Sequence, residues 1–148
     1  MNLAQNSHLK LERFWREYLN DESFGLPQIY IYHGRFAGIL TETLKIDGIT
    51  FGKHIFIAPK LVTRNSKHHL KISSNLIAHE IAHTLQYGRE GFFGFLYKYL
   101  KGFRRNLRQK EKWSSNSVQI AYWNIPFEIE AREIASKFIT WSLNRKIE

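Results

Sequence analysis

The sequence contains no cysteine among its 148 residues. This absence excludes disulfides, a thiol nucleophile and zinc sites built on cysteine, and it leaves the redox compartment undetermined. The N-terminus lacks a charged segment followed by an apolar stretch, so no signal peptide is expected. No segment approaches the ~20 apolar residues that a transmembrane helix requires. We therefore expect a cytoplasmic protein without a transmembrane segment.

Acidic residues are also scarce, with 13 Asp and Glu against 22 Lys and Arg, which gives a formal charge of +9. The basic residues concentrate in one segment, at Lys98, Lys101, Arg104, Arg105, Arg108, Lys110 and Lys112. Such a segment attracts nucleic acid or an anionic surface, although a solvated helix face is the commoner explanation of a charge run. The charge alone therefore supports a nucleic-acid or anionic partner only weakly, and the sequence is silent on oligomeric state.

The most specific feature that is present is His79-Glu80-Ile81-Ala82-His83, an H-E-x-x-H pattern. It lies in a segment, residues 74–87, that is expected to be helical and to end before Gly88. Residues four apart on a helix lie one above the other, with Cβ atoms about 5–6 Å apart, so His79 and His83 can bind one metal ion. Glu80 lies about 100° around the helix from His79, where it reaches a water beside the metal. The pattern predicts a zinc site with Glu80 as the catalytic base.

Two histidines leave the zinc site incomplete, because a catalytic zinc usually has three protein ligands and a water. The three-histidine form of the motif requires glycine at position 86 and histidine at position 89, and the chain has Gln86 and Arg89 instead. A downstream carboxylate is the remaining common solution, and the helix expected from Pro126 offers Glu128 and Glu130. Both flank its apolar face, about 80° to either side, so periodicity does not choose between them.

The remaining pattern predicts an α+β fold that forms one domain, residues 1–148. An apolar face predicts an N-terminal helix over about residues 3–19, and the segment from Phe92 has the same period. Short strands are expected at 28–33, 48–52 and 54–58, with 36–43 pairing with the first, while 113–125 is ambiguous. The expected architecture is a small mixed sheet with an N-terminal helix, packed on the helix of the H-E-x-x-H motif and two further helices.

The chain resembles the zincin-like metallopeptidases, on the gluzincin side, and most of all small bacterial H-E-x-x-H domains. The resemblance covers residues 49–52, the motif helix with residues 86–87, residues 91–99 and residues 126–131. Gluzincins typically carry Glu-x-x-x-Asp on the helix after the motif helix, with a small residue before the Asp. Glu128 and Ala131 match this pattern, so the resemblance favours Glu128 over Glu130 as the third ligand. Arg132 stands where these families have the aspartate that orients a zinc-bound histidine, so another residue must do this here.

Motif and resemblance together predict a metallopeptidase that hydrolyses peptide or protein substrates with Zn²⁺ held by His79, His83 and Glu128. Glu80 takes a proton from the attacking water and passes it to the leaving amine.

The substrate is expected to lie extended along an exposed strand edge, at residues 52–58. Three residues are candidates for stabilising the negative charge that develops on the carbonyl oxygen: Tyr122, His54 and Arg132.

A non-catalytic zincin-like module is the alternative. Zinc would stabilise the fold, and the basic aromatic helix from Phe92 to Lys112 would bind a protein, nucleic acid or membrane partner. The departure at Arg132 motivates this reading, while the intact Glu80 counts against it, because a purely structural site needs no base. A third hypothesis is a DNA-associated protease that finds its substrate through the basic residues.

Overall fold

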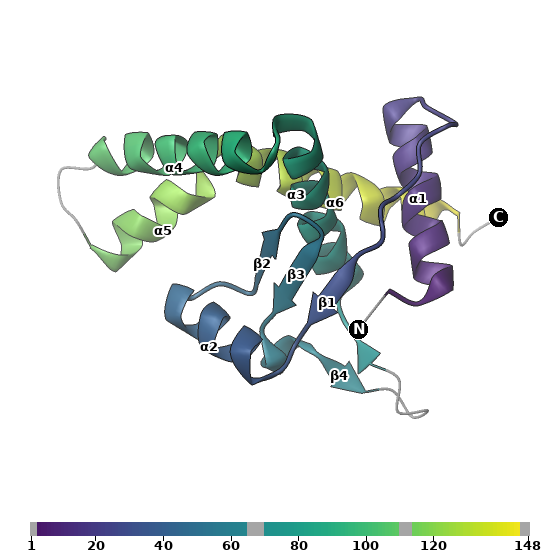
Figure 1. Ribbon diagram of the computed structural model, residues 1–148, viewed down its shortest axis with the longest axis horizontal. Coiled ribbons are helices and arrows are strands. Elements are labelled where there is room, and N and C mark those ends of the chain that lie inside the picture. Colours follow the sequence, from purple (N-terminus) through teal and green to yellow (C-terminus); the bar gives the residue numbers. More distant parts are fainter. Residues whose placement is uncertain (1–2, 65–69, 110–113, 146–148) are drawn as a thin grey trace.

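The computed structural model describes residues 3–64, 70–109 and 114–145. These residues form a mixed α+β fold with a small sheet and an N-terminal helix, as the sequence predicted (Figure 1). The helices are α1 (Gln5–Leu19), α2 (Arg35–Leu44), α3 (Ser74–Glu90), α4 (Phe92–Arg108), α5 (Ser115–Trp123) and α6 (Pro126–Asn144). The strands are β1 (Tyr30–Tyr32), β2 (Gly48–Phe51), β3 (His54–Ile57), β4 (Thr63–Arg64) and β5 (Leu70–Lys71), with a 3₁₀ turn at Pro59–Leu61. Among the described residues, no helix combines the length and apolar character needed to cross a bilayer.

The main sheet has the strand order β1-β3-β2. β2 runs antiparallel to β3, with Thr50 opposite Ile55, and β1 runs parallel to β3, with Ile31 opposite Ile55. β3 is therefore the central strand. The prediction of an exposed edge at residues 52–58 is wrong for this reason, because both sides of β3 are paired. The edge strands of this sheet are β1 and β2.

Residues 36–43 form most of helix α2, so the prediction that they pair with the first strand is wrong. The parallel pairing of β1 with β3 requires a crossover, and α2 is part of that connection. The hydroxyl groups of Thr41 and Thr43 donate to the carbonyl oxygens of Ala37 and Ile39, at 2.8 and 2.7 Å. These i→i−4 bonds satisfy the two β-branched polar residues within a helix.

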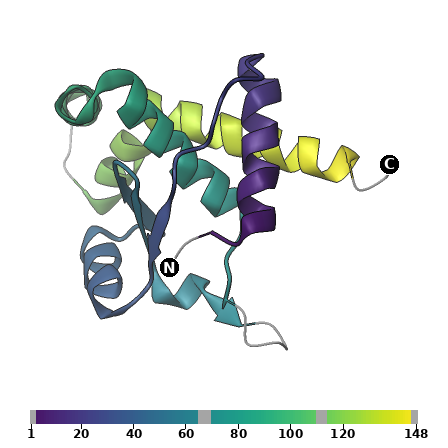
Figure 2. The same ribbon diagram turned by 45° about the vertical axis from the view of Figure 1, so that its right-hand side comes forward.

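The core forms where the sheet packs against α3, on the side opposite α2 (Figures 1 and 2). Ile31, Ile55 and Ile57 of the sheet are buried in one cluster with Ile77 and Ile81 of α3. Helices α1 and α6 complete that cluster with the buried residues Leu11, Phe14, Trp15, Ala131, Ile134, Ala135 and Phe138. α3 is thus held on both sides, by β2 and by α6, which fixes the position of the motif it carries.

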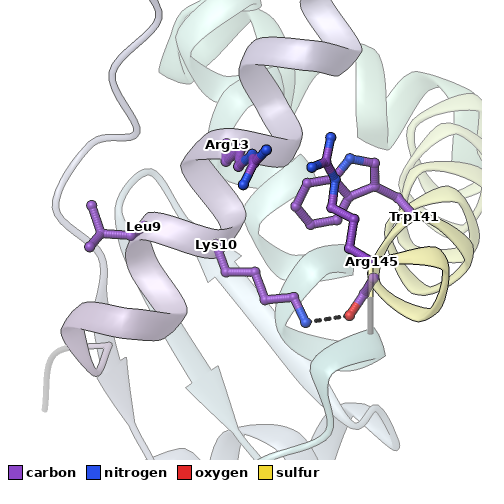
Figure 3. Close-up of a pocket in the computed structure, with 6 residues that line it drawn as sticks. Leu9, Lys10, Arg13, Trp141 and Arg145 are labelled. Atoms are coloured by element: carbon purple, nitrogen blue, oxygen red, sulfur yellow. Dashed lines mark hydrogen bonds between the residues drawn. The ribbon is translucent and has the colours of Figure 1, made fainter. Parts of the chain in front are cut away.

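Helices α1 and α6 are joined by polar contacts around a surface hollow (Figure 3). Lys10 donates to Ser142, and the indole Nε1 of Trp141 donates to Glu17 at 2.6 Å. Arg145 also donates to Glu17, at 2.6 Å. The Trp141 hydrogen bond and the Arg145 charge hold the pKa of Glu17 below its ordinary value. These contacts tie the N-terminal helix to the last one.

One helix boundary differs from the sequence prediction, and one ambiguous segment is helical. α3 does not end before Gly88 but continues to Glu90, and the break before α4 falls at Gly91, whose φ of 71° suits glycine. The ambiguous segment 113–125 contains α5, while Trp113 lies outside the described residues. The Ser114 hydroxyl caps α5 by accepting from the Ser117 amide at 3.2 Å. α4 and α6 start where the sequence predicted.

Candidate metal centre

The structure brings together the three side chains that the sequence singled out as zinc ligands. His79 and His83 lie one turn apart on α3, and Glu128 lies in the first turn of α6, which packs against α3. The two Nε2 atoms are 3.2 Å apart. Glu128 Oε2 is 3.2 Å from His79 Nε2, and Glu128 Oε1 is 3.3 Å from His83 Nε2. The two Nε2 atoms and the Glu128 carboxylate therefore face one another, with one ligand atom from each residue within 4.8 Å of the others.

This spacing can be compared with the requirement of a tetrahedral metal ion. With metal–ligand bonds of about 2.0–2.2 Å, neighbouring ligand atoms of a tetrahedron lie about 3.3–3.5 Å apart. The observed separations of 3.2–3.3 Å are close to those edges, with the carboxylate facing His79 through Oε2 and His83 through Oε1. Two imidazoles and one carboxylate form a donor set that suits a divalent metal ion. The His79–His83–Glu128 group is therefore one that can hold a metal ion.

Gln86 sets the tautomer of His83. The Gln86 side-chain nitrogen faces two acceptors, the Phe127 carbonyl at 3.1 Å and Glu130 Oε2 at 3.0 Å, so the amide oxygen must be the atom that faces His83. His83 Nδ1 lies 2.8 Å from this oxygen and donates to it. When His83 is neutral, its lone pair is therefore on Nε2, the atom that faces Glu128. Gln86 therefore orients the His83 ring.

Glu130 belongs to the outer part of the same network. Arg89 binds the Glu130 carboxylate through two nitrogen atoms, at 2.7 and 3.0 Å, and Gln86 donates to it as well. The hydrogen bond from Arg89 holds the pKa of Glu130 below its ordinary value. Glu128 faces the histidines and Glu130 fixes Gln86, so the two carboxylates that periodicity left equivalent have different surroundings.

Sequence reasoning treated Gln86 and Arg89 only as departures from the three-histidine motif. A usable signal was present, because Gln86 follows His83 by three residues and so lies beside it on the same helix face. Arg89 lies three residues further on, next to Gln86 on that face. The partner of Arg89 is 41 residues away in the sequence, and local spacing carries no information about it.

We expect Gln86→Ala to weaken metal binding by about 10–100-fold, the usual effect of removing an outer-shell partner of a metal-binding histidine. Without the amide oxygen, His83 is free to place its proton on Nε2 and its ring orientation is no longer fixed. Competition with a chromophoric chelator measures the change. Gln119→Ala, an exposed position on α5, is the matched control. An unchanged metal affinity in Gln86→Ala would show that the hydrogen bond from His83 Nδ1 to Gln86 has no role in metal binding.

Glu128 is buried and held in its ionised form. Burial by itself raises the pKa of Glu128, but hydrogen bonds from His79, His83 and Tyr99 outweigh it, and the pKa lies well below its ordinary value. The Tyr99 hydroxyl donates to Oε1 at 2.6 Å, which orients the carboxylate. Burial lowers the pKa of His83, but the hydrogen bond to Glu128 and the negative charge of Glu128 outweigh this effect, so the pKa is raised. Without a metal, the two groups attract each other as an ion pair.

Glu80 lies on the β2 side of α3 and is buried. Its Oε2 accepts a hydrogen bond from the Thr50 hydroxyl at 2.7 Å. Gly48 leaves the space for its other oxygen, since a Cβ at position 48 would lie 2.5 Å from Glu80 Oε1. Burial raises the pKa of Glu80, and the charges of His83 and His79 counteract this only in part. The edge strand β2 thus both makes room for Glu80 and orients it.

The three candidates for oxyanion stabilisation lie in different surroundings. Tyr122 packs against the second core cluster together with Tyr99, whose hydroxyl donates to Glu128. Burial raises the pKa of Tyr122, and the charges of Glu128 and Glu80 raise it further, so its hydroxyl remains a donor. His54 is exposed, with Nδ1 3.0 Å from the Tyr32 hydroxyl. Arg132 donates to the Trp123 carbonyl and lies over the Trp123 ring. Tyr122 thus interacts electrostatically with Glu128 and Glu80.

A family model described as "eCIS core domain" matches residues 17–91 of the chain, just over half of it. The matched region runs from the end of α1 to the break after α3, so it includes His79, Glu80 and His83 and ends before Glu128. No curated protein and no solved structure gives a significant match.

Proposed function

The chain belongs to the eCIS core domain family, and from the geometry of its His79–His83–Glu128 group we propose that it is a zinc-dependent metallopeptidase. The observation that carries the proposal is the convergence of two Nε2 atoms and one carboxylate at 3.2–3.3 Å, with a buried glutamate directly after the first ligand. A zinc ion bound there supplies Lewis acidity, polarises the substrate carbonyl and lowers the pKa of water towards about 7.

Glu80 is the general base in this proposal. Its Oε2 is engaged by Thr50, so Oε1 is the oxygen that takes the proton from the attacking water. A raised pKa suits this task, because a base works best when its pKa is near the operating pH. Glu80 then passes the proton to the amine that leaves when the peptide bond breaks. Tyr122, whose hydroxyl stays protonated beside Glu128 and Glu80, donates to the developing oxyanion.

The substrate lies along β2 rather than along the central strand β3. β2 is an edge of the sheet, and its residues Gly48 and Thr50 are the ones next to Glu80. An extended peptide that pairs with the free side of this strand would run past the metal centre. The backbone of β2 then supplies affinity that does not depend on the substrate sequence.

A non-catalytic zinc-stabilised module remains the second candidate, favoured by the burial of His83 and Glu128. The surroundings of Glu80 argue against it. A buried carboxylate with a raised pKa costs stability at neutral pH, and a metal site that only braces the fold has no use for one. The two candidate functions are distinguished by whether the protein turns over a peptide substrate.

The proposal is tested by measuring metal content and peptide cleavage on the same purified protein. We expect one zinc ion per chain, cleavage of an unfolded protein substrate, loss of cleavage after removal of the metal with a chelator, and recovery on addition of zinc. A protein that binds no zinc would refute the metal site. Zinc binding without turnover across varied substrates would refute the peptidase and favour the module.

A further inference from the structure

Helix α4 has one buried face and two exposed faces of different character. Phe95 and Gly102 lie on the buried face, where a Cβ at position 102 would be in ordinary contact with Pro126 Cδ, at 3.5 Å. At 100° per residue, the exposed residues Phe93, Tyr97 and Leu100 fall within about 60° of one another on a different face. Their exposed fractions are 82%, 64% and 55%. We call these three residues the apolar ridge.

The third face of α4 is basic. Lys101, Arg105 and Arg108 lie directly next to the apolar ridge, and Arg104 lies within it, at 100° per residue. All four are exposed. The helix contains no acidic residue. Lys98 is paired with Glu90 of α3, and Lys110 and Lys112 lie outside the described residues. The outer surface of α4 thus combines large apolar side chains with four basic residues that have no ion pair within the described part of the chain.

The position of α4 leaves this surface open. Figures 1 and 2 both show α4 along the periphery, with α5 and the rest of the protein on one side of it. Its packing partners are α3, α5 and α6, and these contact the buried face. α4 also lies just beyond the residues that match the eCIS core domain. The ridge is therefore required neither for the core nor for the metal centre.

We propose that the outer face of α4 binds the surface of an anionic lipid bilayer. Aromatic and leucine side chains on a convex helix enter the headgroup region, while neighbouring lysines and arginines attract anionic headgroups. The two exposed faces of α4 meet both requirements along the same length of helix. Nucleic acid would use the arginines and would stack a base on Phe93 or Tyr97, but it would leave Leu100 in water, because an aliphatic side chain does not stack on bases. The arrangement therefore fits a lipid surface better.

The experiment is co-sedimentation of the full chain with vesicles of phosphatidylcholine alone and of phosphatidylcholine mixed with phosphatidylserine. We expect binding to the mixed vesicles, and a loss of at least about tenfold in the double variant Phe93→Ser/Leu100→Ser and in Lys101→Glu/Arg105→Glu. The matched control is Phe36→Ser/Ile39→Ser, which removes two apolar side chains of α2 that are 68% and 66% exposed. The control is expected to bind like the wild type, and circular dichroism verifies that each variant is folded.

Three outcomes would overturn the proposal. The first is no binding of the wild type to mixed vesicles. The second is loss of binding in the charge variant but not in the ridge variant, which would indicate adsorption of a basic protein without insertion. The third is an equal loss in the α2 control. Single-stranded DNA provides a further check: tight, salt-sensitive binding to it without vesicle binding would assign the basic face to nucleic acid instead.

Discussion

Replacing Glu80 with glutamine is expected to lower the rate of peptide hydrolysis by about 10²–10⁴-fold, the usual contribution of a general base, while the metal stays bound. Glutamine has nearly the same shape and can still accept the Thr50 hydrogen bond, but it cannot take a proton from water. His79, His83 and Glu128 are unchanged in this variant. Cleavage of a fluorogenic peptide and metal content by atomic absorption measure the two properties separately.

Glu133→Gln is the matched control, because Glu133 is an exposed glutamate on α6. It is expected to retain both activity and metal. Residual cleavage by Glu80→Gln at the wild-type rate would mean that another group acts as the base. Loss of metal in Glu80→Gln would mean instead that Glu80 holds the ion.

The same variant carries a prediction about stability. The folded-state pKa of Glu80 is raised, so folding favours its protonated form and is penalised as the pH rises above the ordinary pKa of a glutamate. At neutral pH the metal-free Glu80→Gln protein should therefore have a free energy of unfolding that is no lower than that of the wild type. Urea unfolding of the metal-free proteins measures this. Such a result would mark Glu80 as a residue kept for chemistry at a cost in stability.

The motif helix was predictable from sequence because everything it requires is local. His79 and His83 are four residues apart, and a helix places them on one side whatever surrounds it. α1, α4 and α6 were predictable for the same reason, since their apolar residues recur with the helical period. These elements carry all three side chains of the His79–His83–Glu128 group and most of the helical framework around it.

The sheet was less predictable because its order depends on contacts distant in sequence. β1 pairs with β3, 24 residues further on, and not with the segment that follows it directly. Gly38 and the two threonines of α2 resemble a broken strand in isolation. In the fold, Gly38 lies against Pro59, and a Cβ at position 38 would be 3.3 Å from the Pro59 Cγ, which is a tight contact. The threonine hydroxyls donate to carbonyl oxygens of their own helix. Tertiary packing outweighs the local preference here.

The third ligand shows the limit most clearly. Glu128 and Glu130 are equivalent by periodicity, and only the resemblance to gluzincins favoured Glu128. In the structure the difference arises from α3. This helix places the histidines against Glu128, and it places Gln86 and Arg89 against Glu130. The residues that ruled out the three-histidine motif are thus the ones that distinguish the two carboxylates.

This difference gives the second large prediction. Glu128→Gln is expected to weaken metal binding by more than about 100-fold, beyond the usual effect of losing an outer-shell partner, because it removes a charged ligand. The matched variant Glu130→Gln should weaken binding by about tenfold or less, since it loosens Gln86 and leaves all three ligands in place. Both substitutions remove one negative charge from the same helix turn, so a difference between them cannot arise from net charge.

Metal affinity of both variants is measured by competition with a chromophoric chelator, and circular dichroism establishes that each is folded. Tyr99 can donate to glutamine at position 128 as it does to the carboxylate, so the Glu128 variant keeps this contact. Loss of metal in Glu130→Gln but not in Glu128→Gln would reverse the assignment of the third ligand. Equal loss in both would mean that the Arg89–Glu130–Gln86 network positions His83 as strictly as Glu128 binds the ion.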